Sequence, residues 1–270
     1  MRSSYDHPAY YHLSYSHGMG EEIRFIRSLL EKHLVPPPAK ILEPACGTGR
    51  VLLPLLEAGY RGSGFDNNGN AIRYLKQRLQ RKRSRARVFN ADLADFVIPG
   101  GPFDAAVCTV DTFRHLLTEA DAVNHLRCVA RHLRKDGIYL LALHLLPRNG
   151  YSSQISRWRD RQGKLDLHTT ITVLDVNRRQ RTETLSIVYN VQTEHSRKKF
   201  RYVYRLRTYS LRQFNALMNK VPAFEIAAAY TYYAFDAGAP LQPDTGTEDV
   251  LLVLRQVQHV IPVVPGRTSR

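Results

Sequence analysis

Residues 41–50, with the sequence ILEPACGTGR, constrain the fold more than any other part of the 270-residue chain. An apolar strand leads directly into a loop of small residues, and the segment after the loop has a helical apolar face. Gly47 and Gly49 allow the backbone to adopt positive φ and to pass close to a ligand. An isolated G-x-G is a weak signal, because an ordinary tight turn gives the same pattern. The surrounding sequence therefore decides whether this loop binds a cofactor.

A second predicted strand ends at Asp66, 17 residues beyond Gly49. In a doubly wound sheet a carboxylate at this position lies beside the glycine loop and can accept hydrogen bonds from both hydroxyls of a ribose. Further strands are predicted over 88–93, 103–109 and 137–146, and helices over 50–58, 69–83 and 119–133. This alternation predicts a parallel sheet whose right-handed crossovers bring the loops after the first and fourth strands to one edge. We expect the site at that edge.

Together these features resemble the class I S-adenosylmethionine-dependent methyltransferases, and the resemblance covers residues 5–255. A dinucleotide dehydrogenase would have G-x-G-x-x-G, whereas position 52 is Leu. Glu43 suits a sulfonium cofactor with an ammonium group better than a pyrophosphate, because an acidic loop repels phosphate. The resemblance implies an α/β fold with a doubly wound, seven-stranded, mostly parallel sheet, and S-adenosylmethionine as the cofactor.

The resemblance also implies which residues surround this cofactor, all of them at the ends of the first four strands. The methionine part lies among Glu43, Ala45, Cys46, Gly47 and Gly49, the ribose on Asp66, the adenine beside Asn67, Asp92 and the backbone near Leu93, and the methionine ammonium on the carbonyl of Thr109. Two alternatives stay open. Asp92 could instead cap a helix over 93–96, and Cys46 could be a small packing residue.

Beyond Pro147 the hydrophobic pattern changes from helical spacing to alternation, which predicts three antiparallel strands near residues 167–173, 185–191 and 200–206. A similar insertion forms a lid or a subunit contact in many small-molecule methyltransferases, so a homo-oligomer could associate through it. The expected organisation is an N-terminal cap helix in 1–35, a cofactor-binding core over 36–149, the β insertion over 150–208, a last helix and closing strands over 209–256, and a loose tail over 257–270.

Residues 111–116 follow the fourth strand, where class I enzymes often place residues against the transferred methyl. In the sugar amino-group N-methyltransferases a similar run places a histidine near the acceptor amine, and His115 matches it. An imidazole can take the proton that an amine or hydroxyl loses on methylation, so His115 is the candidate catalytic base. The alternative is a histidine at a helix start that bonds to the backbone. Asp111 and Arg114 replace smaller residues of that pattern, so a sugar is not implied.

Four further residues are candidates for the substrate side, besides Asp111. Tyr11 and Tyr15 could close over the site, as N-terminal tyrosines do in several relatives, since aromatic faces suit a sulfonium. Arg207 and Tyr209 resemble an Arg-x-Tyr feature near the pocket of related enzymes. All four could equally be packing residues.

The composition indicates one globular unit in a reducing compartment. Three cysteines, Cys46, Cys108 and Cys128, show no metal-binding spacing and cannot all pair with one another. The longest apolar run, residues 138–146, is too short to span a bilayer, and the first residues have no signal-peptide core. We therefore expect a cytoplasmic protein with no membrane contact and no metal.

The charge of the chain leaves the acceptor open. The formal net charge is +15, and eight of the fifteen residues from 73 to 87 are Lys or Arg. A second acid-free basic stretch lies between Glu194 and Glu225. These stretches could bind RNA or could be solvated surface. Methyl transfer to a nitrogen or oxygen of a small molecule is the favoured function. RNA methylation and a non-catalytic role, in binding the cofactor or a partner, are the alternatives.

Overall fold

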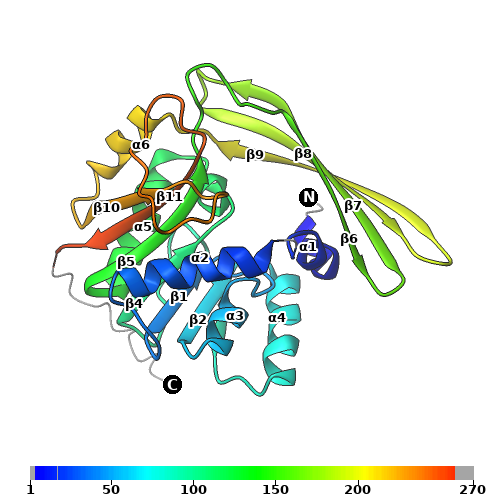
Figure 1. The fold of residues 1–270 in the computed structure, drawn as a ribbon, viewed down its shortest axis with the longest axis horizontal. Helices are drawn as coiled ribbons and strands as arrows, with labels where there is room; N and C mark the ends of the chain where they lie inside the picture. Colours follow the sequence, from blue (N-terminus) through cyan, green and yellow to red (C-terminus); the bar gives the residue numbers. More distant parts are fainter. Residues whose placement is uncertain (1–3, 17, 259–270) are drawn as a thin grey trace, which may run out of the picture.

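Seven strands form one mixed sheet in the order β10 (Phe224–Tyr230), β11 (Asp249–Gln256), β5 (Leu133–His144), β4 (Phe103–Cys108), β1 (Lys40–Pro44), β2 (Arg61–Asp66) and β3 (Arg87–Asn90). The computed structural model describes residues 4–16 and 18–258 (Figure 1). β1 to β5 pair in parallel, and only β11 pairs antiparallel with β5 and β10. The chain order reverses between β1 and β4, so the carboxyl ends of these two strands flank the crevice in which such sheets bind ligands. The predicted fold class is confirmed.

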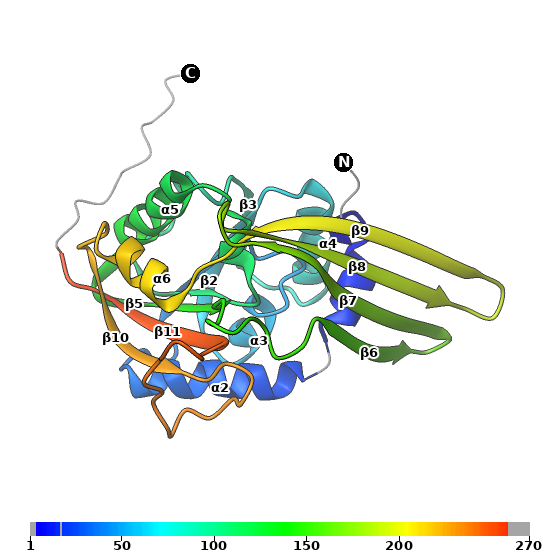
Figure 2. The ribbon, with the colours of Figure 1, turned by 90° about the horizontal axis from the view of Figure 1, so that it is seen from above.

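Helices cover both faces of this sheet. α2 (Met19–Lys32), α3 (Leu52–Glu57) and α4 (Gly69–Arg81) lie on one side, and α5 (Glu119–His132) and α6 (Leu211–Met218) on the other (Figures 1 and 2). Two apolar cores result, one containing Leu126 of α5 and Phe214 of α6, the other Ile26 and Leu29 of α2. The strands between them are buried on both faces, which is why they read as continuous apolar runs.

Polar caps fix where several of these helices begin. The Asn68 side chain accepts hydrogen bonds from the N–H groups of Asn70 and Ala71, and α4 begins there. Ser210 and Gln213 form a reciprocal capping box at the start of α6. The predicted helices over 50–58, 69–83 and 119–133 are found within two residues of their expected bounds. β5 starts at Leu133 rather than at residue 137.

The inserted segment contains four antiparallel strands, not three: β6 (Ile155–Gln162), β7 (Leu165–Asn177), β8 (Thr182–Gln192) and β9 (Arg197–Arg207). β6 was not predicted, because its sequence ISRWRDRQ has no apolar alternation. It is held instead by backbone pairing with β7, from Ile155 opposite Thr172 to Gln162 opposite Leu165. The four strands form a curved sheet that projects from the core beside the N-terminal helix α1 (Pro8–Ser14) (Figures 1 and 2).

The N-terminal segment contains more than the one helix that was predicted. A 3₁₀ turn, η1 (Ser4–Asp6), and the short helix α1 precede α2. Leu13 of α1 packs in a cluster with Leu167, Ile187 and Tyr189 on the inner face of the four-stranded sheet. The predicted tail over 257–270 falls largely on residues 259–270, which lie outside the described residues. Among those that are described, no helix is long and apolar enough to cross a membrane.

Candidate cofactor and acceptor sites

A cavity of about 400 Å³ opens at the carboxyl ends of β1, β2 and β4, where the sequence predicted the site. Nine of the ten predicted cofactor residues line it: Glu43, Ala45, Cys46, Gly47, Asp66, Asn67, Asp92, Leu93 and Thr109. They come from four separate strand ends, which the parallel topology brings to one edge. A cavity of this size suits a cofactor or another small molecule.

Asp66 is fixed at the end of β2 by backbone donors. Its Oδ2 accepts the N–H of Gly47 at 2.9 Å, and its Oδ1 accepts the N–H of Asn68 at 2.7 Å. Burial raises the pKa of this carboxyl, and the backbone N–H groups oppose the rise. Gly47 has φ +50°, and a Cβ there would meet nothing closer than the Asp66 carboxylate at 3.9 Å. The loop therefore leaves open space beside the carboxylate that the ribose would need.

Glu43 is a buried carboxyl with one structural partner. Its Oε2 accepts the N–H of Leu52 at 2.8 Å, and burial raises its pKa to about 8 although Arg50 counteracts the rise. A cationic ligand beside it would lower this pKa and favour the carboxylate. The cavity is thus suited to a molecule that carries positive charge, as the sulfonium and ammonium of S-adenosylmethionine do.

Gly49 does not line the cavity, so its predicted place against the cofactor is a correction. Its φ is +74°, and a Cβ would lie 2.3 Å from Cδ1 of Leu75 in α4. This glycine is required because the loop packs tightly onto α4. Cys46 lines the cavity and also packs closely against Gly64, so the place in the site and the packing role that were left open for it are both compatible with the structure. Its Sγ lies 2.8 Å from where a Cβ on Gly64 would be.

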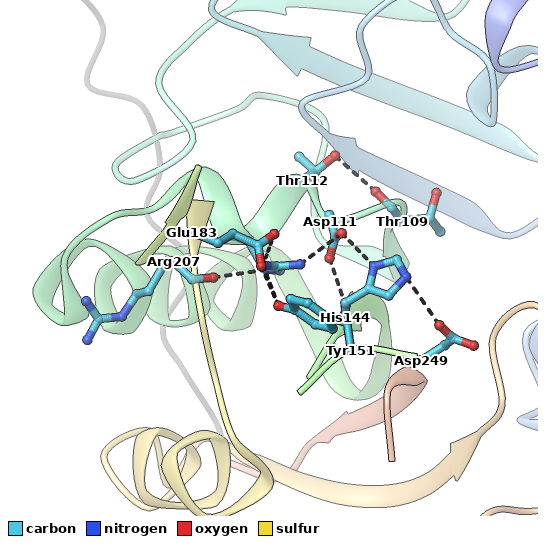
Figure 3. A network of polar contacts seen from close by, with 9 residues as sticks. Thr109, Asp111, Thr112, His144, Tyr151, Glu183, Arg207 and Asp249 are labelled. Atoms are coloured by element: carbon cyan, nitrogen blue, oxygen red, sulfur yellow. Dashed lines mark hydrogen bonds and ion pairs between the residues drawn. The ribbon is translucent and has the colours of Figure 1, made fainter. Parts of the chain in front are cut away.

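The alternative role for Asp92 is wrong, because no helix forms over 93–96. Its Oδ1 accepts the N–H of Ala94 at 2.7 Å within an irregular segment that borders the cavity. Thr109 borders the cavity too, and its carbonyl already accepts a hydrogen bond from the hydroxyl of Thr112 at 3.0 Å (Figure 3). A ligand ammonium would share this carbonyl, which has two lone pairs.

Arg50 is a lining residue that the sequence analysis missed. It forms a bidentate ion pair with Glu22 of α2, and its Nη2 donates to Oγ1 of Thr109 at 3.0 Å. The hydroxyl of Tyr232 donates to the same glutamate. This buried cluster attaches α2 to the glycine loop. The position of Arg50 directly after G-T-G was the only signal, and its partner is 28 residues away.

A second cavity of about 390 Å³ lies between the core and the four-stranded sheet. Tyr11, Tyr15 and Asp111, which were predicted on the substrate side, line it. Four residues line both cavities: Tyr5, Tyr11, Val110 and His115. The cofactor cavity and this acceptor cavity therefore meet at these residues.

His115 stands at that junction. It is the last residue of the 3₁₀ turn η2 (Thr112–His115) rather than a helix-start residue, and its Nε2 lies 3.4 Å from the Tyr5 hydroxyl. Burial lowers the pKa of His115, an effect that Asp111 opposes and Arg114 reinforces. The imidazole is therefore neutral at neutral pH and able to accept a proton.

A network of buried charges forms one wall of the acceptor cavity (Figure 3). Asp111 accepts hydrogen bonds from the backbone N–H of His144 at 2.8 Å, from its Nδ1 at 2.6 Å and from Nη1 of Arg114 at 3.1 Å. Arg114 also pairs with Glu183 at 2.5 Å. Val110 and Asp111 have φ of +54° and +59°, and such a strained backbone needs support of this kind.

Arg207 and Tyr209 line neither cavity, which corrects their predicted place near the substrate. Nη1 of Arg207 donates to the carbonyl of Leu117 at 2.7 Å, and its own carbonyl accepts Nε of Arg114 at 2.9 Å. Tyr209 is fully buried against Phe113 and beneath the Arg207 guanidinium, 5.5 Å from its ring centroid. Both residues support the wall from behind.

Three lining residues of the acceptor cavity had no clear sequence signal: His144, Trp158 and Asp249. His144 is a polar residue inside an apolar run, which could have marked it. The other two lie in β6, which was not predicted, and at the start of β11. The described residues contain no cluster of three or more side chains that could hold a metal ion.

Comparison with known proteins agrees with this geometry. A family model described as a methyltransferase domain matches residues 41–137, the segment that carries the glycine loop and the strand ends. Residues 41–137 form a class I S-adenosylmethionine-dependent methyltransferase domain. The resemblance seen in the sequence is confirmed, and the cofactor of such domains is S-adenosylmethionine.

Relatives of this methyltransferase domain include a putative methyltransferase, YqeM, of Bacillus subtilis, 30% identical over 111 residues that cover 41% of this chain and 44% of that protein. A dTDP-3-amino-3,6-dideoxy-alpha-D-glucopyranose N,N-dimethyltransferase of Streptomyces fradiae is 26% identical over 124 residues, or 46% of each chain. The chain thus spans about half the length of these curated relatives.

Among solved structures, the sugar N-methyltransferase KedS8 from Streptoalloteichus superposes with a TM-score of 0.69 at 19% identity, over 89% of this chain and 88% of that one. An S-adenosylmethionine-dependent methyltransferase from Clostridium acetobutylicum gives 0.71 at 13% identity, over 88% and 92%. At these identities the likeness concerns the fold, which here extends well beyond the matched domain.

Proposed function

We propose that this protein transfers the methyl group of S-adenosylmethionine to a nitrogen or oxygen atom of a small molecule bound in the acceptor cavity. The observation that carries the proposal is the junction at which Tyr5, Tyr11, Val110 and His115 line both cavities. A methyl donor in one cavity and an acceptor in the other would meet there. The printed activities of the relatives, which include N-methylation of amino sugars, support this reaction class.

The residues of the chain would mainly align the reactants. When bound, S-adenosylmethionine supplies a methyl group already activated by positive sulfur, so orientation and exclusion of water contribute most to the rate. Asp66 would accept hydrogen bonds from the ribose, and Glu43 would balance the positive charge. His115, neutral at the junction, would take the proton that the acceptor atom loses.

RNA methylation is the second candidate, favoured by the basic stretches and by a 28% identity over 115 residues to a ribosomal RNA small subunit methyltransferase C of Alcanivorax borkumensis. No residue of the basic stretch 73–87 lines either cavity. The acceptor cavity instead lies under the four-stranded sheet, and its volume suits a small molecule. RNA binding that weakens steeply with salt, together with methylated RNA as product, would favour this second candidate over the first.

Calorimetric titration with S-adenosylmethionine and S-adenosylhomocysteine tests the cofactor site. Asp66→Ala should weaken binding by about 100-fold, because two hydrogen bonds to a charged acceptor are lost. Asp175→Ala, an exposed aspartate in β7 that lines neither cavity, is the matched control and should bind as the unchanged protein does. If the unchanged protein does not bind either compound, the proposed activity is wrong and the non-catalytic alternative without a cofactor remains.

A further inference from the structure

The acceptor cavity has an acidic lining, although the chain as a whole has a net charge of +15. Four carboxylates face it, and they outnumber its two strong cations: Asp111, Glu183, Glu248 and Asp249 against Arg114 and His144. A chain with this excess of basic residues would not place negative charge in a cavity by composition alone. The lining therefore indicates what the cavity binds.

Two of these carboxylates are already neutralised by the cations. Asp111 and Glu183 both pair with the fully buried Arg114. His144 is enclosed by Asp111 at 2.6 Å and Asp249 at 3.2 Å, and although burial opposes its charge, these carboxylates raise its pKa to about 10. The two cations balance only two of the four carboxylates, so the lining keeps a net negative charge. Asp249 and its neighbour Glu248 are the two carboxylates that do not pair with Arg114.

Asp249 and Glu248 are positioned to use that charge on a ligand. Asp249 contacts His144 through Oδ1, and its side chain keeps 29% of its surface exposed. Glu248 accepts the backbone N–H of Ser152 at 3.0 Å through Oε2, which orients its carboxylate. The two residues are adjacent at the start of β11, so both carboxylates lie at the same end of the cavity lining.

The rest of the lining suits a cation as well. Seven tyrosine and tryptophan side chains border the cavity: Tyr5, Tyr11, Tyr15, Tyr151, Trp158, Tyr204 and Tyr233. Aromatic faces attract cations through the ring quadrupole, and they attract a neutral hydroxyl far less. The combination of carboxylates and aromatic rings is typical of sites that bind ammonium groups.

We propose that the acceptor is an amine that enters the cavity as its ammonium ion, and that Asp249 and Glu248 hold this charge. The inference rests on the proposed function for the methyl transfer that follows, but the binding step does not depend on it. The neutral His115 at the junction is placed to take the proton that the nitrogen must lose before it attacks.

Trp158 allows this binding to be measured directly, because it is the only tryptophan of the chain and lines the acceptor cavity. We would titrate the protein with benzylamine and cyclohexylamine, and with benzyl alcohol and cyclohexanol as neutral counterparts of the same shape, and follow tryptophan fluorescence. Each amine should bind at least about 10-fold more tightly than its alcohol, as a hydrogen-bonded ion pair gives.

The variant Glu248→Gln/Asp249→Asn should reduce this preference to less than about 3-fold, because the shape of the cavity stays and its net negative charge goes. Asp175→Asn removes one exposed carboxylate of β7 outside the cavity and should keep the full preference. Glu248→Gln alone serves if the double variant does not fold, which thermal unfolding would reveal, and it should reduce the preference in part.

Equal binding of amines and alcohols would overturn the inference, and so would a preference that the variants retain or a titration in which no amine changes the fluorescence. Binding of S-adenosylhomocysteine, measured separately, keeps the two proposals distinct. A protein that binds it without preferring amines contradicts only the amine inference. A protein that prefers amines but binds no cofactor contradicts only the methyl transfer.

Discussion

The two cavities are built in different ways. The cofactor cavity is formed by strand ends and by the glycine loop between β1 and α3, where the backbone conformation makes the site. The acceptor cavity is formed by side chains that are far apart in sequence, such as Tyr15, Asp111, Trp158 and Asp249, and a network of buried charges holds its wall. A site formed by local backbone can be predicted from a short sequence pattern, whereas a site formed by distant side chains cannot.

This difference predicts that the acceptor wall is sensitive to loss of a charge. Arg114→Met should lower the free energy of unfolding by about 3–5 kcal/mol, because Asp111 and Glu183 would stay buried without their cation. Denaturant unfolding measures the effect. The matched control is Arg159→Met, which removes an exposed ion pair with Asp166 and should leave stability nearly unchanged. Equal losses in the two variants would contradict the role of the network.

A substitution at the junction between the cavities should lower the rate of methyl transfer rather than the stability of the fold. His115→Asn should lower kcat by about 100-fold while the affinity for S-adenosylhomocysteine stays within about 2-fold, because the imidazole would act on the acceptor. Single-turnover kinetics and calorimetry separate the two quantities. An unchanged kcat with a good acceptor would remove His115 from the reaction, and a parallel loss of cofactor affinity would show a structural role.

Within the glycine loop, two alanine substitutions should differ in their main effect, which is on stability for Gly49 and on cofactor binding for Gly47. Gly49→Ala should destabilise the protein by about 2 kcal/mol, because positive φ is combined with a Cβ placed 2.3 Å from Leu75. Gly47→Ala should destabilise the protein by only about 1 kcal/mol, from the positive φ alone, because its Cβ would meet open space. The same Cβ should weaken cofactor binding, because it would occupy space beside Asp66. Thermal unfolding and calorimetry of both variants would sharpen the comparison, and identical behaviour would contradict it.

The pH dependence of stability tests the charged wall of the acceptor cavity gradually, without removing its ion pairs at once. Since His144 keeps its proton in the folded protein up to about pH 10, but an ordinary histidine loses it near 6.5, stability from this group should fall as pH rises between these values. His144→Gln should therefore show a flatter decline, by at most about 1.4 kcal/mol per pH unit within this window. Denaturant unfolding at several pH values measures it, and parallel curves would mean that His144 is not held protonated.

The parts of the molecule that the sequence predicted share one property. The glycine loop, Asp66 and the alternating elements are encoded within short windows, because helix caps, apolar periods and positive-φ glycines act on neighbouring residues. The predictions failed where contacts are long-range. β6 has a charged sequence and exists through pairing with β7, and Arg207 sits behind the cavity because it bonds to Leu117, which is 90 residues earlier in the chain.

The sequence by itself determined the class of fold and the edge of the sheet at which nine of the ten predicted cofactor residues line one cavity. Only the tertiary structure decided the rest. It turned Gly49 into a packing residue, paired Arg50 with Glu22, and brought His144 and Asp249 together. The physical reason is that a backbone turn is set by its own residues, whereas the burial and pairing of a charge depend on which distant side chains the folded chain places beside it.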